Sequence, residues 1–469
     1  MAQARSAVTT LPASRVQIIA PSSLGETAIA ALRARGIAAH VVDELIPSDD
    51  VVAWALDRPP TGAAAVELGA ACARAAAAGR PICLLAPPPR GSGRAAIERA
   101  AALAYLRAHG AALGHDVDSW LEAVVMLVRF GMPSGPHAAV IAPPGSWLEA
   151  QTLGLAAEAE LAGVRPPLVG TSEATDVALY DPALGVPPSS TPGLHVPVIA
   201  RAELADGSGA LFGVRGALGA TLLLGRAAER IAAGLGPAPA SASAELSIDQ
   251  EKLARQLNKL ASASIGDHET KVLLSAYGVP VTRQKVAETA SAAIKIARVI
   301  GFPVEIKPWS GDGDLPTEPD GCPIRVDLTS DAMVRAGFAA MIAANPSKRS
   351  DHRGEAVIVR GAPPAGRELA VTFLKLAALG WTVVLDGQHI AAAPAPLRLV
   401  DAQQLAGTLV ASRAGEPELD RVGLANILRR VSHLVVDLDV RLVRLELSRV
   451  VVPGPGARAV VVDAFAELR

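Results

Sequence analysis

A short pattern that occurs twice in the first half of the chain constrains the fold most. Each copy is an apolar strand, a turn rich in small residues and proline, and a helix. The two strands and turns lie at Val16–Ser22 and Ala138–Pro144. In the first copy a helix predicted over Glu26–Arg35 is followed by a second apolar strand. Strand, turn, helix and strand in this order predict a parallel βαβ unit. We therefore expect two successive doubly wound, flavodoxin-like α/β modules.

The segments between the two copies continue the alternation of strands and helices. Apolar runs at Ala64–Leu68 and Pro81–Leu85 predict further buried strands. Helices are predicted over Arg94–His109 and over Asp118–Phe130, each followed by a glycine. Asp118 or Ser119 is the expected cap of the second helix.

A stretch of proline, alanine and serine divides the chain. Residues 236–244 read GPAPASASA, a composition that cannot bury a core and is typical of a linker. A chain of 469 residues is too long for one ordinary core. The expected parts are a flexible tail at 1–13, modules at 14–88 and 89–235, a linker at 236–247 and a C-terminal domain at 248–469.

Composition excludes several classes of function. A net charge of -2 and an aromatic content of 3% argue against binding of nucleic acid. No run of about 18 apolar residues predicts a membrane-spanning helix. The three cysteines, Cys72, Cys83 and Cys322, fit a reducing cytoplasm and form no metal cluster. His109 and His115 have no accompanying cysteine pair, so we expect no zinc site.

Five motifs follow one another in the C-terminal domain. They lie at Glu269–Pro280, Gly301–Lys307, Ala362–Glu368, Leu445–Ser448 and Val461–Ala464. In order and approximate spacing this set resembles the ATP-grasp domain of the ADP-forming acyl-CoA synthetases. The resemblance implies ATP or ADP, Mg²⁺ and CoA as ligands. We therefore expect an α/β protein in which two flavodoxin-like modules precede an ATP-grasp domain.

The resemblance also implies roles for three side chains of this domain. Lys307 supplies a cation for the phosphates, Glu446 a carboxylate for Mg²⁺, and Glu368 a hydrogen bond to nucleotide or an ordering contact in its strand. Each has a plainer alternative. A strand lysine is usually a solvated edge residue. Glu446 can face solvent near Arg444, and Glu368 can form a surface ion pair with Arg367.

The chain departs from the family pattern at three places. Residues 315–322 replace a motif that contains His, Lys and Gly-Gly. Residues 385–389 replace a Gly-rich loop and bring in Asp386, whose charge is unfavourable beside phosphate. Glu446 and Ser448 stand where the family has the metal-binding Asp and Asn.

The first half resembles the succinyl-CoA-ligase-like modules of the same family. The turns at Ala20–Gly25 and Ala142–Gly145 stand in place of its Ser-Gln-Ser-Gly and Ser-Gly-Gly turns. Gly25 and Gly145 are therefore candidate cofactor-binding residues. The family's CoA-binding Rossmann domain is missing, so we expect a separate CoA-binding subunit and an oligomer.

His109 is the candidate catalytic residue. The family transfers phosphate through a phosphohistidine in a His-Thr-Gly-Ala-Leu segment, and residues 109–113 read HGAAL. In a competing alignment residues 94–110 are an ordinary helix and the catalytic segment is deleted. The second alignment is favoured because Gly110 makes a normal helix end, where a histidine interacts well with the helix dipole.

Three functions follow from these features. The chain is a ligase subunit that makes acyl-CoA and ADP, a nucleotide- or CoA-binding pseudoenzyme, or a structural partner of a chain with the missing domain. For each of them we expect a cytoplasmic protein. The altered motifs favour the second and third functions, and the family's usual role favours the first.

Overall fold

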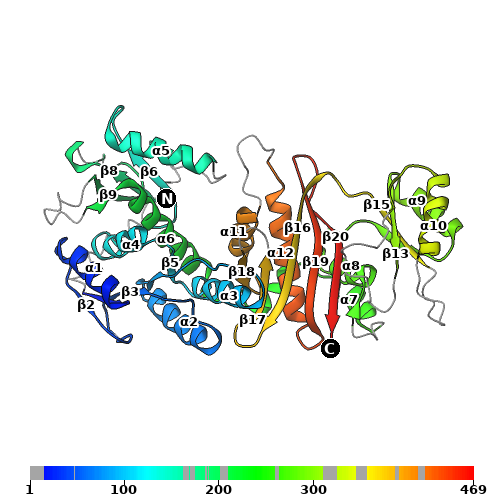
Figure 1. The fold of residues 1–469 in the computed structure, drawn as a ribbon, viewed down its shortest axis with the longest axis horizontal. Coiled ribbons are helices and arrows are strands. Elements are labelled where there is room, and N and C mark those ends of the chain that lie inside the picture. The colour runs from blue at the N-terminus through cyan, green and yellow to red at the C-terminus, as the bar shows by residue number, and fades with distance from the viewer. Residues whose placement is uncertain are drawn as a thin grey trace, which may run out of the picture. The chain divides into compact units, whose positions relative to one another are not determined.

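The chain folds into two compact units, which are described separately below (Figure 1). One is Met1–Gly236 with Ala411–Glu416, and the other is Pro237–Val410 with Pro417–Arg469. The computed structural model describes residues 15–46, 48–161, 168–169, 175–184, 187, 190–200, 210–258, 264–309, 325–344, 356–385, 390–409 and 418–469. Within these ranges no helix is both long and apolar enough to cross a membrane.

The first unit begins with a five-stranded parallel sheet in the order β2-β1-β3-β4-β5. Its elements are β1 Val16–Ile19, α1 Ser22–Arg33, β2 Ala39–Val41, β3 Val51–Ala55, α2 Gly62–Ala77, β4 Cys83–Leu85, α3 Arg94–Ala108 and β5 Ala112–Gly114. The sheet continues past residue 88, where we expected the first module to end, because β5 pairs with β4.

A second five-stranded parallel sheet follows in the order β10-β9-β8-β6-β7. Its elements are α4 Val117–Arg129, β6 Ala138–Ile141, α5 Trp147–Leu161, β7 Leu168–Val169, β8 Val177–Tyr180, the 3₁₀ turn Pro182–Leu184, β9 Leu194–Ile199, β10 Leu211–Phe212 and α6 Val214–Ala233. Because β1 and β6 hold the same place in their sheets, the prediction that the repeated pattern starts two equivalent parallel units is confirmed.

Helix α4 joins the cores of the two sheets. Its buried apolar side chains pack in one cluster with strand residues of both sheets, among them Val16 and Val177. The buried Trp120 indole donates to the Cys83 carbonyl at 2.9 Å. The helix is capped by Asp116, whose carboxylate accepts from the Ser119 amide, rather than by Asp118 or Ser119 as expected.

One expected strand of the first unit is wrong. Ala64–Leu68 lies inside helix α2, and the strand between β1 and β4 in the sheet is β3 at Val51–Ala55. A short apolar run carries no period that separates a buried strand from a buried helix. The alanines before and after this run favour the helix.

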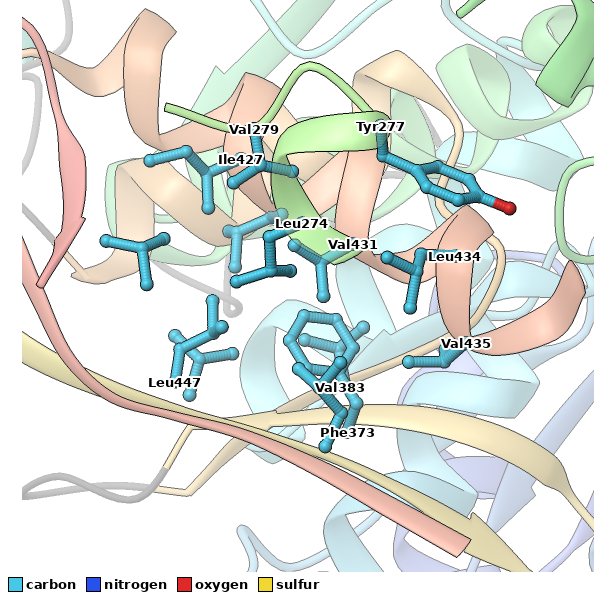
Figure 2. Close-up of a cluster of buried hydrophobic side chains, with 14 of the residues drawn as sticks. Leu274, Tyr277, Val279, Phe373, Val383, Ile427, Val431, Leu434, Val435 and Leu447 are labelled. Atoms are coloured by element: carbon cyan, nitrogen blue, oxygen red, sulfur yellow. The ribbon is translucent and has the colours of Figure 1, made fainter. Parts of the chain in front are cut away.

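The second unit contains a six-stranded sheet in the order β11-β20-β19-β16-β17-β18, with every pairing antiparallel. Helices α8 and α12 cover one face, where Leu274 and Val431 pack over Phe373 and Leu447 (Figure 2). The elements are the 3₁₀ helix Ala240–Glu245, α7 Gln250–Leu257, β11 Ser264–Ile265, α8 Asp267–Ala276, β16 Gly366–Leu376, β17 Gly380–Leu385, β18 Ala391–Pro394, α11 Leu399–Leu409, α12 Arg421–Asp437, β19 Leu442–Pro453 and β20 Val460–Leu468.

The same unit contains a smaller antiparallel sheet in the order β12-β15-β13-β14. Val304, Ile306, Val357 and Val359 pack with residues of helices α9 and α10. Because side chains alternate along a strand, the residues between them point to the opposite face. The elements are β12 Gln284–Ala287, α9 Ala290–Ile300, β13 Val304–Pro308, β14 Arg325–Leu328, α10 Asp331–Ala344 and β15 Val357–Gly361.

The Pro/Ala/Ser stretch is held against the second unit. The Ala238 amide donates to the Pro396 carbonyl at 2.8 Å, and Glu245 pairs with Arg429 at 2.8 Å. Leu246 is buried. The boundary between the units therefore lies at Gly236, the start of the expected linker, and the residues after it carry defined contacts.

Candidate functional site

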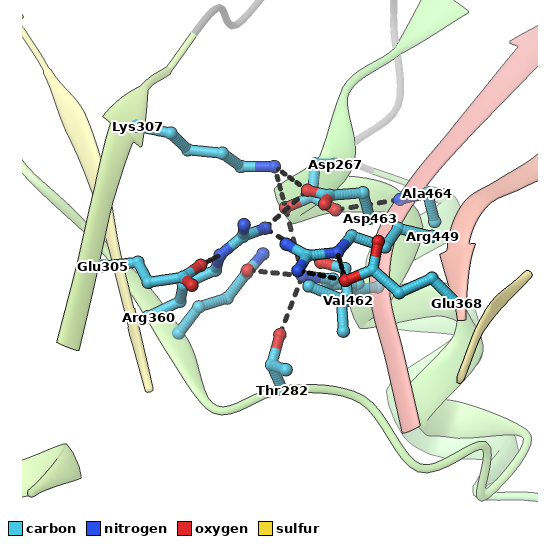
Figure 3. Close-up of polar contacts among 12 residues, drawn as sticks. Asp267, Thr282, Glu305, Lys307, Arg360, Glu368, Arg449, Val462, Asp463 and Ala464 are labelled. Atoms are coloured by element: carbon cyan, nitrogen blue, oxygen red, sulfur yellow. Dashed lines mark hydrogen bonds and ion pairs between the residues drawn. The ribbon is translucent and has the colours of Figure 1, made fainter. Parts of the chain in front are cut away.

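A cluster of buried ions lies on the polar face of the small sheet, where this sheet meets α8 and β20 (Figure 3). We call this cluster the ion network. Two members come from α8, two from β13, one from β15 and one from β20. They are Asp267, Lys271, Glu305, Lys307, Arg360 and Asp463.

Lys307 lies at the centre of the ion network. Its Nζ is 2.9 Å from Asp267 Oδ2 and 2.5 Å from Asp463 Oδ1. The residue is only 6% exposed, so the alternative of a solvated edge lysine is wrong. A buried ammonium needs such partners because removing an unpaired ion from water costs on the order of several kcal/mol.

Arg360 links the two sheets from β15. Its Nε donates to Glu305 Oε2 at 2.6 Å, and its Nη1 donates to Asp463 Oδ1 at 2.5 Å and to the Val462 carbonyl at 3.1 Å. Arg360 and Glu305 are also directly opposite on adjacent strands. Nη2 is buried and has no hydrogen-bond partner within the described ranges.

Asp267 anchors the ion network to the large sheet. Its Oδ1 accepts from the Ala464 amide at 3.0 Å, and its Oδ2 is 3.2 Å from Lys271 Nζ. Lys271 also donates to Thr282 Oγ1 at 2.9 Å and Gln284 Oε1 at 2.7 Å. Burial lowers the pKa of Lys271 to about 8, although Asp267 opposes the shift.

The ion network is electrically balanced, with three cations and three carboxylates. Burial alone would raise the pKa of Asp463. The Lys307 ammonium and the Arg360 guanidinium nevertheless hold that pKa well below its usual range. Asp463 therefore carries a full negative charge between the two cations.

Glu368 forms a second ion pair beside the ion network (Figure 3). Its Oε1 accepts from Arg449 Nε at 2.9 Å and from Nη2 at 2.5 Å, so the carboxylate contacts Arg449 rather than Arg367 as the alternative proposed. Arg449 on β19 lies directly opposite Asp463 on the adjacent strand β20. Lys307 and Glu368 lie in different sheets, on β13 and β16, and both belong to the group of residues drawn in Figure 3.

Glu446 lies on β19 with the buried Leu445 and Leu447 on either side. Its carboxylate accepts from Arg444 Nη2 at 2.6 Å, the pairing that the plainer alternative described. In the part of the chain that the structure describes, no group of three or more His, Cys, Asp or Glu side chains could hold a metal ion.

His109 is the residue that ends helix α3. Its Nδ1 lies 2.8 Å from the Tyr105 carbonyl, and Gly110 follows with φ of 86°. The imidazole is half-buried, and burial lowers its pKa. His109 therefore lies at an ordinary helix end, as the alignment without the catalytic segment expects.

The two candidate glycines differ in conformation. Gly25 lies within α1, which begins at Ser22, so the expected turn over Ala20–Gly25 is wrong. Gly25 is buried, and a Cβ there would lie 3.2 Å from Val41. Gly145 has φ of 80° between β6 and α5, and its amide donates to Glu149 Oε2 at 2.6 Å.

Sequence reasoning missed five members of the ion network, all except Lys307. The sequence offers Asp267 as a cap for the helix that follows it, but Gly266 is the capping residue and the Asp267 carboxylate points to Lys307. Lys271, Glu305 and Asp463 lie in recognised motifs without an expected role, and Arg360 lies in none of the motifs. Two departures from the family pattern, residues 315–322 with Cys322 and residues 386–389, lie outside the described residues.

Comparisons with known proteins identify the second unit. Residues 259–468 match a family model described as ATP-grasp domain. This part of the chain is therefore an ATP-grasp domain within a mixed α/β protein. An acetate–CoA ligase [ADP-forming] II subunit beta from Pyrococcus furiosus is 26% identical over 211 residues, 42% of this chain and 89% of that relative.

A second sequence relative is of the same kind. A 4-hydroxybutyrate–CoA ligase [ADP-forming] from Nitrosopumilus maritimus is 26% identical over 226 residues, 45% of this chain and 32% of that relative. A solved structure of a dinucleotide-forming acetyl-coenzyme A synthetase from Ca. Korarchaeum cryptofilum is 25% identical, with a TM-score of 0.42, and covers 47% of this chain and 100% of its own. The sequence relatives of the ATP-grasp domain are thus ADP-forming acid–CoA ligases.

Proposed function

We propose that the chain is a diverged ADP-forming acyl-CoA synthetase whose second unit binds ATP or ADP for that ligase chemistry or for a remnant of it. The observation that carries the proposal is that the ATP-grasp match, residues 259–468, contains Lys307, Glu368 and Glu446 in one compact unit. The ligase names of its sequence relatives support the same chemistry.

Lys307 and Arg360 are the proposed phosphate-binding cations. Arg360 Nη2 is a buried donor without a partner in the described ranges, and charge-assisted donors of this type bind phosphate oxygens well. Glu368 is proposed to contact the nucleotide or to order β16. The first role requires Glu368 to exchange its bond to Arg449 for one to the nucleotide, and the second retains that bond.

Glu446 and Ser448 are the proposed Mg²⁺ ligands. They are two positions apart on β19, and a carboxylate with a hydroxyl matches the hard oxygen donors that Mg²⁺ takes together with phosphate and water. When bound, the ion would neutralise phosphate charge. Glu446 would then exchange Arg444 for the metal.

The first unit is proposed to consist of two flavodoxin-like modules. In both sheets the strands, numbered along the chain, follow the order 2-1-3-4-5 of that fold. Ligands of such sheets bind beyond the carboxyl ends of the strands. Gly145, which follows β6, is the better placed of the two glycines for CoA or nucleotide, because Gly25 is buried against Val41.

A catalytic version of the proposal needs further parts. His109 would carry phosphate between sites, and a separate CoA-binding subunit would complete a hetero-oligomer. The name of the Pyrococcus relative as a beta subunit supports such a partner. We place the assembly in the cytoplasm, which the free buried thiols of Cys72 and Cys83 support.

Nucleotide or CoA binding without turnover is the second candidate function. One observation favours it: Lys307, Glu368 and Glu446 are each paired with an opposite charge inside the protein. A ligand must replace these internal partners before the residues can act on it.

Calorimetric titration of the full chain with ADP, ATP and CoA in the presence of Mg²⁺ tests the proposal. We expect binding of ADP or ATP and little formation of acyl-CoA from short acids by this chain alone. Turnover that His109→Ala abolishes would establish the catalytic version in a single chain. Turnover that appears only with a second chain would establish the hetero-oligomer. A chain that binds neither nucleotide would refute the proposal.

A further inference from the structure

Asp463 lies where a phosphate oxygen would have to approach Lys307 and Arg360. Its Oδ1 is 2.5 Å from Lys307 Nζ and 2.5 Å from Arg360 Nη1 (Figure 3). At 21% its side chain is the most exposed of the ion network, while Asp267 and Arg360 are fully buried at 0%. The carboxylate of Asp463 is therefore the partner of Lys307 that solvent can reach.

Asp267 and Asp463 contribute differently to the ion network. Asp267 accepts the Ala464 amide and contacts Lys271, so its carboxylate also joins α8 to β20. Among the described residues, the Asp463 carboxylate accepts hydrogen bonds from Lys307 and Arg360. A neutral replacement at 463 thus removes charge between the cations and leaves the Asp267 anchor in place.

We propose that Asp463 is a specificity-determining residue, an internal counter-ion that weakens the binding of nucleoside di- and triphosphates at Lys307 and Arg360. This inference rests on the proposed function, because it assumes that these cations face the phosphates. The ion network has no net charge with Asp463 and one net positive charge without it. Since phosphate groups are anionic, the neutral network attracts them less than the positive one.

The test compares ADP affinity in the full chain and in Asp463→Asn by calorimetry with Mg²⁺. Asparagine keeps the size and an acceptor for Lys307 but removes the charge. We expect ADP to bind about tenfold more tightly or better, a change of about 1.4 kcal/mol. The gain must disappear in the double variant Lys307→Met/Asp463→Asn. Equal or weaker binding by Asp463→Asn overturns the inference.

Asp331→Asn is the matched control. Asp331 pairs with Arg298 between α10 and α9, outside the ion network, and the same substitution there should leave ADP affinity unchanged. A similar gain in this control would mean that overall charge, rather than Asp463, sets the affinity, and would overturn the inference.

The outcomes separate this inference from the proposed function. ADP binding by the unaltered chain tests the function, and the ratio between variant and unaltered chain tests the inference. Binding only by Asp463→Asn supports the inference and refutes nucleotide binding by the natural chain, while binding by neither overturns both. Asp463→Ser, which also removes the charge, serves as second variant. If neither variant folds, as judged by circular dichroism, Asp463 is a structural residue and the inference is overturned.

Discussion

Two largely buried carboxylates, one in each unit, have pKa values that are shifted in opposite directions. Glu122 of the first unit forms a bidentate pair with Arg35 at 2.6 and 3.1 Å, and burial raises its pKa despite this cation. Burial favours the neutral form of Asp463 as well, but two cations lower its pKa well below the usual range. Glu122 has one adjacent cation and is the more deeply buried, whereas Asp463 has two cations and is more exposed, so attraction to cations outweighs burial only at Asp463.

The surroundings of the two carboxylates also differ. The Arg35 guanidinium lies 3.6 Å from the Phe212 ring centroid, and Glu122 also accepts the Phe212 amide at 3.0 Å. Both side chains of this pair are at most 5% exposed, so it has the character of a structural link between α4, β10 and the residues after α1. Asp463 is more exposed and contacts two cations. A ligand anion could therefore take its place beside Lys307 and Arg360.

Breaking the Arg35–Glu122 pair should have the largest effect. Glu122→Ala leaves a buried guanidinium without its carboxylate, so we expect a loss of about 3–5 kcal/mol in the free energy of unfolding. Urea denaturation followed by circular dichroism measures it. The double variant Arg35→Met/Glu122→Leu should regain most of the stability, because apolar side chains replace both ions. A loss below about 1 kcal/mol in the single variant, the range of surface pairs, would contradict the structural role.

Removing the central cation of the ion network should reduce ligand affinity next. Lys307→Met leaves the ion network with one net negative charge. We therefore expect ADP to bind at least about tenfold more weakly, a loss of about 1.4 kcal/mol in binding free energy. Calorimetry measures the affinity under conditions where circular dichroism shows a folded chain. Stability should fall too, since Asp267 and Asp463 each lose a cation. Equal ADP affinity would remove Lys307 from the proposed site.

The opposite pKa shifts predict opposite pH dependence of stability. Asp463 has a lowered pKa when folded, so its contribution is present above the unfolded value of about 3.9 and is lost as the pH falls below it. Asp463→Asn should therefore show a smaller loss of stability from pH 5 to pH 3, about the range in which Asp titrates. Glu122 has a raised pKa, so its contribution is present at low pH and is lost as the pH rises through the folded value. Glu122→Gln should reduce the loss of unfolding free energy that accompanies rising pH. If both variants show the same dependence of stability on pH, the two carboxylates do not differ as proposed.

The smallest effect is expected for an exposed pair. Arg298 and Asp331 join α9 to α10 at the surface, where solvent screens the charges. Asp331→Asn should leave the free energy of unfolding almost unchanged. Thermal unfolding at two salt concentrations measures it, and a larger loss would mean that this contact is more than a surface ion pair.

Local patterns predicted much of the secondary structure near the site. The glycine and proline after α9 and the apolar residues at Val304 and Ile306 indicated the strand that carries Lys307, and β13 lies there. The sequence predicts a strand over residues 281–286 and Ser291 as the cap of the next helix. The structure has β12 at Gln284–Ala287, and Thr289 caps that helix. Such boundaries depend on single hydrogen bonds, which apolar spacing does not encode.

The sequence by itself determined the α/β class, the two equivalent parallel units and the position of Lys307 on a strand, because these depend on neighbours a few residues apart. Only the tertiary structure decided what surrounds that lysine. Lys307 and Asp463 are 156 residues apart in sequence, and Arg360 and Asp463 are 103 apart. Their contact depends on how the small sheet meets α8 and β20, and no local period carries that information. The same lysine would be an exposed cation on an isolated sheet and is a buried, neutralised one here.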